Sequence, residues 1–250
     1  MLDVVRERDY VKVADLADQF SISEVTVRSD LEALATRGLI RRIRGGAIAT
    51  DVPRRERAFE ESEAEFAAEK IAIGRAAAAL VRSGDTVILD VGTTTAAVGR
   101  AMAADVELRD VVVFTNSLRI AVQLEPVIPR FTVVVTGGTL RPLQHSLVDP
   151  LGDGVLDRIR ADMVFVGCNG VDPVAGITNI NLPEAEMKRR MMASARRRIV
   201  VADGSKVGRV ELARLCAVSE VDLLMTGSSA DEAVLADLTD RGMRVEVVDA

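Results

Sequence analysis

The sequence predicts an α/β protein with a small N-terminal domain of helices and a β-ribbon and a larger domain built on a mostly parallel sheet. Two patterns predict this. In the first part of the chain, aliphatic residues recur every three or four positions, as in short amphipathic helices. From about residue 86 onward, runs of branched aliphatic residues alternate with amphipathic stretches, which is typical of buried parallel strands and covering helices. We expect domains at residues 1–57 and 58–250.

The composition excludes several classes of protein. Aromatic residues make up 3% of the 250 residues and Trp is absent, which argues against surfaces that stack on sugars or on single-stranded nucleic acid. The two cysteines, Cys168 and Cys216, are far apart and have no neighbouring histidine, so we expect no disulfide framework, no metal and no cofactor. Without a long apolar segment, we expect a soluble cytoplasmic protein with no membrane partner.

The net charge of −6 is unevenly distributed along the chain. Residues 28–57 carry eight arginines against four acids, a local charge of +4, which leaves −10 for the rest. A basic patch on an otherwise acidic protein suits a polyanion such as DNA. A solvated surface is the simpler alternative, which charge alone does not exclude.

Two short helices are predicted around a tight turn in the N-terminal domain. Apolar residues at positions 13, 16, 17 and 20 predict the first helix, and Ser23 is suited to cap the second, which ends near Gly38. This is the helix-turn-helix layout, whose second helix enters the major groove. The residues it would offer to the bases are Ser23, Thr26 and Arg28.

Residues 39–47 alternate apolar and basic side chains, which predicts a β-ribbon wing. Arg41, Arg42 and Arg44 would face DNA phosphates or the minor groove. A helix-turn-helix pattern alone is matched equally well by a helical hairpin, and the wing favours DNA binding. A charged, aperiodic stretch from Thr50 to Glu65 follows as an exposed linker, and a long helix is expected over about 63–81.

Seven strands are predicted in the larger domain, at 86–90, 111–114, 131–135, 163–166, 199–202, 223–225 and 245–248. The first five end in Gly, Thr, Asn, Asp or Lys. Because ligands of open α/β sheets bind at the carboxyl ends of the strands, these ends are the expected site.

The loop Asp90-Val-Gly-Thr-Thr-Thr95 opens a helix, and its glycine and hydroxyls suit a phosphate. It matches neither a Walker loop nor a complete dinucleotide fingerprint, and a plain turn with a Thr cap is the alternative. Glu184 and Lys188 are spaced i, i+4, which predicts either a surface ion pair or a Glu184 aimed at sugar hydroxyls. The single histidine, His145, has no partner in the sequence and is interpreted as incidental rather than catalytic.

The stretch at 13–47, ending in Arg-Ile-Arg-Gly-Gly-Ala, resembles the DeoR family of bacterial sugar-metabolism regulators. The resemblance continues through Asp-Val-Gly-Thr-Thr-Thr (90–95), Thr-Asn-Ser (115–117), Gly-Gly-Thr-Leu-Arg (137–141), Glu-Ala-Glu-Met-Lys (184–188) and Asp-Gly-Ser-Lys-Val-Gly (203–208). It implies a sensor domain similar to sugar-phosphate isomerases and CoA-transferases, in which these segments surround a phosphorylated sugar or related effector.

The resemblance implies two sets of effector contacts and a third group beside them. The phosphate is assigned to Gly92, Thr93, Thr94, Thr95 and Lys206, and the polyol end to Asp90, Asn116, Glu184 and Asp203. Gly137, Gly138 and Arg141 complete the expected effector site.

The leading hypothesis is a transcriptional regulator without enzymatic activity, a repressor of carbohydrate-metabolism genes controlled by its effector. Its partners would be double-stranded operator DNA, the effector and a second copy of itself, as a homodimer or homotetramer, because symmetric operators need two-fold proteins. The alternative is a sugar-phosphate isomerase with a carboxylate base and a cation among Asp90, Glu184, Asp203 and Lys206. The basic winged helix distinguishes the two, and a structural scaffold explains neither feature.

Overall fold

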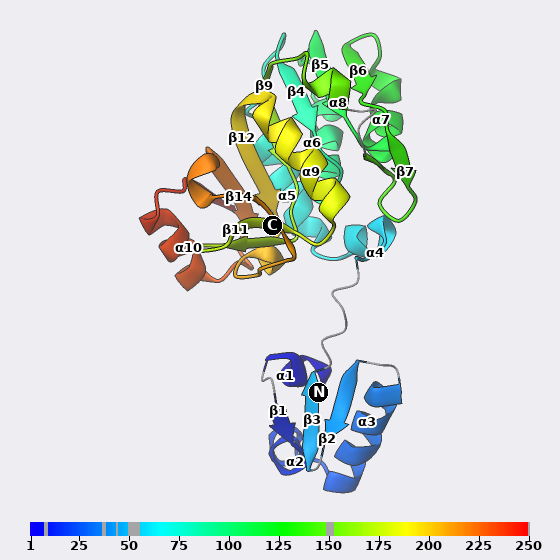
Figure 1. Ribbon diagram of the computed structural model, residues 1–250, viewed down its shortest axis with the longest axis vertical. Helices are drawn as coiled ribbons and strands as arrows, with labels where there is room; N and C mark the ends of the chain where they lie inside the picture. Colours follow the sequence, from blue (N-terminus) through cyan, green and yellow to red (C-terminus); the bar gives the residue numbers. More distant parts are fainter. Residues whose placement is uncertain (8–9, 37–38, 44, 50–55, 149–152, 250) are drawn as a thin grey trace. The chain divides into compact units, whose positions relative to one another are not determined.

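The computed structural model describes residues 1–7, 10–36, 39–43, 45–49, 56–148 and 153–249 (Figure 1). The chain divides into two compact units, Met1–Arg55 and Glu56–Ala250. We call them the N-terminal unit and the C-terminal unit and describe each by itself. The boundary predicted from the sequence follows Arg57.

The N-terminal unit consists of three helices packed on a three-stranded antiparallel sheet of order β1-β3-β2. Its elements are α1 (Leu2–Glu7), β1 (Tyr10–Lys12), α2 (Val13–Phe20), α3 (Glu24–Thr36), β2 (Ile40–Ile43) and β3 (Gly46–Ala49). Buried aliphatic side chains from every element form one core, among them Val5, Val11, Leu16, Val27, Leu31, Ile40 and Ala47.

The predicted helix-turn-helix and wing are both present in this unit. Helix α2 ends at Ser21, which has a left-handed φ of 52°. The Ser23 hydroxyl oxygen accepts the backbone N–H of Thr26 at 3.1 Å, so the predicted cap of α3 is formed. The antiparallel pair β2–β3 is the predicted ribbon.

The C-terminal unit is built on a seven-stranded, fully parallel sheet of order β15-β14-β12-β9-β4-β5-β6. All seven predicted strands are present: β4 (Thr86–Leu89), β5 (Val111–Thr115), β6 (Phe131–Val135), β9 (Ala161–Val166), β12 (Ala195–Ala202), β14 (Leu223–Gly227) and β15 (Val245–Val248). The strands are apolar on both faces because each face is covered, as parallel sheets require.

Successive residues of β4 enter two separate cores. Val87 and Leu89 of β4 pack with α5 (Ala67–Ala78), α6 (Thr93–Ala104) and α7 (Leu118–Leu124), whereas Ile88 packs with α9 (Leu182–Ala193). Figure 1 shows α9 on the near face of the sheet, with α5 and α6 behind it. Helices α4 (Phe59–Ala64), α8 (Asp153–Leu156) and α10 (Glu232–Asp240) and three short 3₁₀ turns complete the described helices of this unit.

The prediction of a single helix over about residues 63–81 was wrong. The chain forms α4 (Phe59–Ala64), breaks at Phe66, which has a left-handed φ of 52°, and continues as α5. The buried Lys70 ammonium donates to the carbonyl oxygen of Ser62 and, at 2.7 Å, to that of Glu65. These bonds replace the helical hydrogen bonds that the break removes, and periodicity alone could not reveal them.

Two small antiparallel sheets lie beside the large one. Strands β7 (Thr139–Arg141) and β8 (Ser146–Val148) form a hairpin, and β10 (Gly170–Asp172), β11 (Gly176–Asn179) and β13 (Ala213–Cys216) form a three-stranded sheet. Within the described residues, no helix is long and apolar enough to cross a membrane.

The strand order of the large sheet reverses between β4 and β9. From β4 the chain proceeds outward to β5 and β6, then returns to place β9 on the other side of β4 and continues to β12, β14 and β15. At such a reversal the loops after the two strands diverge and leave a crevice, where open α/β sheets bind ligands. Asp90 and Gly167 follow these two strands directly.

Candidate functional site

A buried ion pair lies at the strand-order reversal. Asp90 is fully buried, and its Oδ2 accepts the N–H of Gly167 at 3.1 Å and a proton of the Lys188 ammonium. Its Oδ1 is buried and has no hydrogen-bond partner within the described residues. Since an unsatisfied buried carboxylate oxygen is costly, this atom is suited to accept a hydrogen bond from a bound molecule.

The ionisation of Asp90 is set by two opposing effects. Burial raises the pKa of Asp90 to about 6, and the attraction of Lys188 counteracts part of that rise. The carboxyl is therefore ionised at neutral pH and takes up a proton in mildly acidic solution.

The loop after Asp90 leads into α6 through an N-cap glycine. Gly92 has φ 152°, a conformation that glycine adopts more readily than other residues. Thr93, Thr94 and Thr95 begin the helix and are buried. The backbone N–H groups in the first turn of a helix have no partner within the helix and are suited to bind an anion. The Thr95 hydroxyl donates to the Gly92 carbonyl at 2.8 Å, so Thr95 fixes the turn with its side chain.

Helix α9 contributes two buried charges, one turn apart, to the same region. Glu184 accepts the Ser146 hydroxyl at 2.7 Å and the Arg141 guanidinium, whereas Lys188 pairs with Asp90. The surface ion pair considered for Glu184 and Lys188 is wrong, because both are buried and each has another partner. The sequence reasoning did not select Lys188, although its position four residues after Glu184 was a signal that both share one helix face.

Asn116 connects the two loops that border this region. It is fully buried, its Oδ1 accepts the N–H of Val91 at 2.9 Å, and its Nδ2 donates to the Leu147 carbonyl at 3.3 Å. Its amide thereby holds the loop after β4 against β8. Because both ends of the amide have protein partners, Asn116 shapes the site.

Gly137 and Gly138 connect β6 to β7, both with positive φ, 84° and 118°. A Cβ atom on Gly138 would lie 2.4 Å from the carbonyl oxygen of Val148. Gly137 and Gly138, both predicted for the effector site, therefore allow the chain to turn from β6 into the β7–β8 hairpin. Arg141, at the end of β7, binds both Glu184 and Glu56. Burial acts to lower the pKa of Arg141, but the two carboxylates outweigh it and raise the pKa.

Asp203 and Lys206 form a separate cluster at the end of β12. The Asp203 carboxylate caps the following 3₁₀ turn and lies 3.7 Å from Lys70 Nζ and 4.0 Å from Lys206 Nζ. Glu69 lies beside it and accepts the N–H of Gly204 at 3.0 Å and that of Ser229 at 2.9 Å. Strand β9 separates β12 from β4. The cation that contacts Asp90 is thus Lys188, and a phosphate contact from Lys206 stays a prediction.

Cys168 and Cys216 are free thiols, and burial raises the pKa of each to about 12. Both are therefore protonated and unreactive near neutral pH. In the described part of the chain, no cluster of three or more His, Cys, Asp or Glu side chains is arranged to hold a metal ion.

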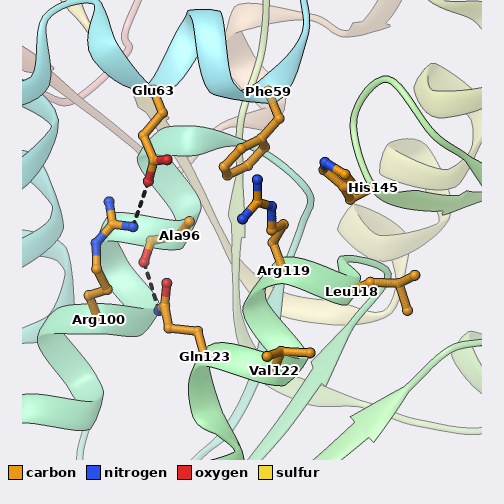
Figure 2. Close-up of a pocket in the computed structure, with 9 residues that line it drawn as sticks. All are labelled: Phe59, Glu63, Ala96, Arg100, Leu118, Arg119, Val122, Gln123 and His145. Carbon is orange, nitrogen blue, oxygen red and sulfur yellow. Dashed lines mark hydrogen bonds and ion pairs between the residues drawn. The ribbon is translucent and has the colours of Figure 1, made fainter.

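The C-terminal unit has a cavity of about 340 Å³, and its lining includes neither Asp90 nor Lys188 at the strand-order reversal (Figure 2). Its lining comes from α4, α6, α7 and the β7–β8 turn: Phe59, Glu63, Ala96, Arg100, Leu118, Arg119, Val122, Gln123 and His145. His145 lies 2.9 Å from Glu60, and its ring packs edge-on against Phe59 at 6.2 Å. The histidine therefore helps to hold the start of α4, and the interpretation that it is incidental rather than catalytic stays a prediction.

The N-terminal unit presents three of the predicted DNA-binding residues at the exposed start of α3. Ser23 and Thr26 share a 2.8 Å hydrogen bond, and the exposed Arg28 pairs with Glu24. Arg42 was expected to face DNA, yet its guanidinium donates to the Arg28 carbonyl at 3.0 Å and lies 3.4 Å from Glu32. It braces the wing against α3. Arg41 lies on β2, and Arg44 lies outside the described residues.

Two family profiles match the chain. A DeoR-like helix-turn-helix domain matches residues 1–52, and the DeoR C terminal sensor domain matches residues 65–228. The chain belongs to the DeoR family.

Several relatives of this DeoR-family protein are similar along nearly its whole length. It is 34% identical to the HTH-type transcriptional regulator GlpR of Haloferax volcanii, over 98% of this chain and 94% of the relative. It is 33% identical to the putative aga operon transcriptional repressor of Escherichia coli O157:H7, over 98% and 89%. It is 29% identical to the glycerol-3-phosphate regulon repressor of Escherichia coli K12, over 99% and 96%.

Among solved structures, ribose 5-phosphate isomerase A from Methanocaldococcus jannaschii matches 55% of this chain and 52% of its own, with 20% identity and a TM-score of 0.40. The two family profiles and the relatives of similar length show that this DeoR-family protein is a DNA-binding transcriptional regulator, with a helix-turn-helix domain for DNA and a sensor domain for a small-molecule effector.

Proposed function

We propose that this regulator represses carbohydrate-metabolism genes and that a phosphorylated sugar or polyol binds at the strand-order reversal of its C-terminal unit. The observation that carries the proposal is the buried Asp90–Lys188 pair, whose Asp90 Oδ1 has no partner within the described residues. The names of two relatives support the class of regulon, one a glycerol-3-phosphate regulon repressor and one an aga operon repressor.

Each end of the proposed effector has a chemical counterpart. The first turn of α6, after Gly92, supplies free N–H groups and the positive end of a helix dipole for the phosphate. Asp90 Oδ1 accepts a hydroxyl of the polyol, and Glu184 offers a second acceptor one helix turn from Lys188. Lys206 stays a candidate cation for the phosphate, with Asp203 beside it.

We propose a purely regulatory rather than enzymatic role. An isomerase needs a carboxylate base and a cation near the reacting carbon, and Asp90 and Lys188 are the right residue types. The winged helix-turn-helix and the regulator names of the relatives favour regulation instead. We also propose a homodimer or homotetramer, because an operator with two-fold symmetry has two half-sites, each bound by one helix-turn-helix domain.

The experiment is a titration of the full chain against its own upstream promoter DNA, followed by fluorescence anisotropy at two salt concentrations. It is repeated with glycerol 3-phosphate, fructose 1-phosphate, fructose 6-phosphate and glucose 6-phosphate. We expect salt-sensitive, sequence-selective binding that one of these compounds shifts by about 5–150-fold.

The variant Asp90→Asn should lose most of that shift while binding DNA as the wild type does. Equal affinity for promoter and random DNA at moderate salt would contradict the operator-binding role. Isomerisation of any of these compounds by the purified protein would support the alternative function, a sugar-phosphate isomerase.

A further inference from the structure

The β7–β8 hairpin connects the proposed effector site with the first residues of the C-terminal unit. On the site side, the Ser146 hydroxyl donates to Glu184 at 2.7 Å. The N–H of Leu147 donates to the Asn116 carbonyl at 2.8 Å. The hairpin is therefore fixed by the same side chains that form the site.

The other side of the hairpin holds the segment 56–60. The N–H of Phe59 donates to the Leu143 carbonyl at 3.0 Å, and the Gln144 side chain donates to the carbonyl of Arg57. His145 lies 2.9 Å from Glu60. This segment is the start of the C-terminal unit and directly follows the N-terminal unit in the sequence.

Arg141 takes part in both sets of contacts. One guanidinium nitrogen donates to Glu184 and the other to Glu56. The three side chains are 17%, 7% and 16% exposed, respectively, so solvent and salt screen their attraction weakly. Two carboxylates on one cation leave a net charge of −1, and a guanidinium forms its strongest bonds with anions.

We propose that Glu56 is a built-in competitor for the effector: its carboxylate occupies the face of Arg141 that an anionic or hydroxyl group of the effector takes when it binds. Effector binding exchanges the Arg141–Glu56 bond for an Arg141–effector bond and frees Glu56. The inference rests on the effector site proposed above. It makes Glu56 the residue through which that site acts on the segment 56–60.

Two measurable consequences follow because coupling between sites is reciprocal. Removing the competing carboxylate strengthens effector binding, since the effector no longer has to displace it. It also weakens the response of DNA affinity to effector, since the exchange that carries the response has already been lost.

The test compares Glu56→Gln with the control Glu63→Gln in the full chain. Glu63 lies in the same part of the chain and pairs at 2.9 Å with Arg100, which is not a residue of the hairpin. Calorimetric titration uses glycerol 3-phosphate, fructose 1-phosphate, fructose 6-phosphate and glucose 6-phosphate. For the compound that binds the wild type most tightly, Glu56→Gln should lower the Kd at least fivefold, and Glu63→Gln should leave it within twofold. Equal Kd values for the wild type and Glu56→Gln would overturn the proposal, even with the effector site itself confirmed.

A second measurement requires no effector. Amide hydrogen exchange at Phe59 should accelerate at least tenfold in both Glu56→Gln and Arg141→Gln, because each breaks the bond that helps hold segment 56–60. It should stay near the wild-type rate in Glu63→Gln. If none of the four compounds binds the wild type, the proposed effector class fails, and this exchange result still decides whether the Arg141–Glu56 bond holds the segment 56–60, which the proposal requires. Wild-type exchange rates in both Glu56→Gln and Arg141→Gln would refute it.

Discussion

At the scale of single residues, the chemistry of the site depends on one buried carboxylate and the lysine that accompanies it. Asp90 and Lys188 are 0% and 3% exposed at the side chain. A buried pair of this kind adds little net stability, but removal of one partner leaves an uncompensated charge. The pair therefore suits a binding function better than a purely structural one.

Effector binding should weaken as the pH falls through about 6. Burial raises the pKa of Asp90 to about 6, and the ionised form is the better acceptor for a polyol hydroxyl. Between pH 7.5 and 5.5, protonation of Asp90 alone should raise the Kd of the wild type about fourfold, as expected for one proton bound with that pKa. Titration calorimetry measures it.

The sulfate ester of the same sugar is the control, because its charge does not change in this range whereas a phosphate titrates. A Kd for the sulfate ester that is independent of pH would exclude Asp90 as the responsible group.

Lys188→Met should destabilise the C-terminal unit by about 3–5 kcal/mol at pH 7, because Asp90 loses its buried partner. The loss should be smaller at pH 5. Without Lys188, the folded protein holds a proton on Asp90 that the unfolded chain releases, so the stability of the variant falls as the pH rises. Urea unfolding followed by circular dichroism gives both values. Adding Asp90→Asn should recover part of the loss, and a double variant as unstable as Lys188→Met would argue against the pairing.

At the scale of elements, hydrogen bonds and close backbone contacts between neighbouring segments hold the hairpin and the wing in place. The β7–β8 hairpin requires Gly138 at φ 118°, and the wing is held to α3 by Arg42. Both features depend on tight contact between backbone atoms and a neighbouring element.

Gly138→Ala should destabilise the C-terminal unit more than Gly84→Ala. Both glycines have positive φ, 118° and 87°, so each substitution strains the backbone by about 1–3 kcal/mol. Only the Cβ on residue 138 would also meet the Val148 carbonyl oxygen at 2.4 Å, whereas nothing lies within 4 Å of the other. Thermal unfolding of the two variants compares them. Equal melting temperatures would mean that the hairpin moves to relieve the collision.

Arg28→Ala and Arg42→Ala should weaken DNA binding in different ways. The exposed Arg28 is expected to contact a phosphate, so its loss should reduce the slope of log K against log salt by about 0.9. Arg42 binds the α3 backbone, so its loss should lower affinity through a loosened wing with the slope nearly unchanged. Anisotropy titrations at several salt concentrations measure both. A reduced slope for Arg42→Ala would show that Arg42 does reach the DNA.

At the scale of the whole molecule, a regulator needs two arrangements of its units that the effector distinguishes. A coupling of about 1–3 kcal/mol changes operator affinity by about 5–150-fold, which the exchange of one partly buried ion pair can supply. The Arg141–Glu56 contact is one of the described interactions that join the proposed effector site to the start of the C-terminal unit.

The sequence by itself determined the helix-turn-helix, the wing, the seven strands of the large sheet and the family. Strands appear as aliphatic runs and helices as 3.6-residue periods, because burial on a pleated or helical surface repeats over a few neighbouring residues. The Ser23 cap, the seven strands of the sheet and the polar strand ends are signals of this local kind.

Only the tertiary structure decided which charged residues meet. Lys188 pairs with Asp90, 98 residues away, and Arg141 with Glu56, 85 residues away. Such partners depend on the order and register of the strands, which no local pattern encodes. The break at Phe66 depends on Lys70 in the same way, because helical periodicity continues across it and only the folded chain brings the ammonium to the two carbonyls.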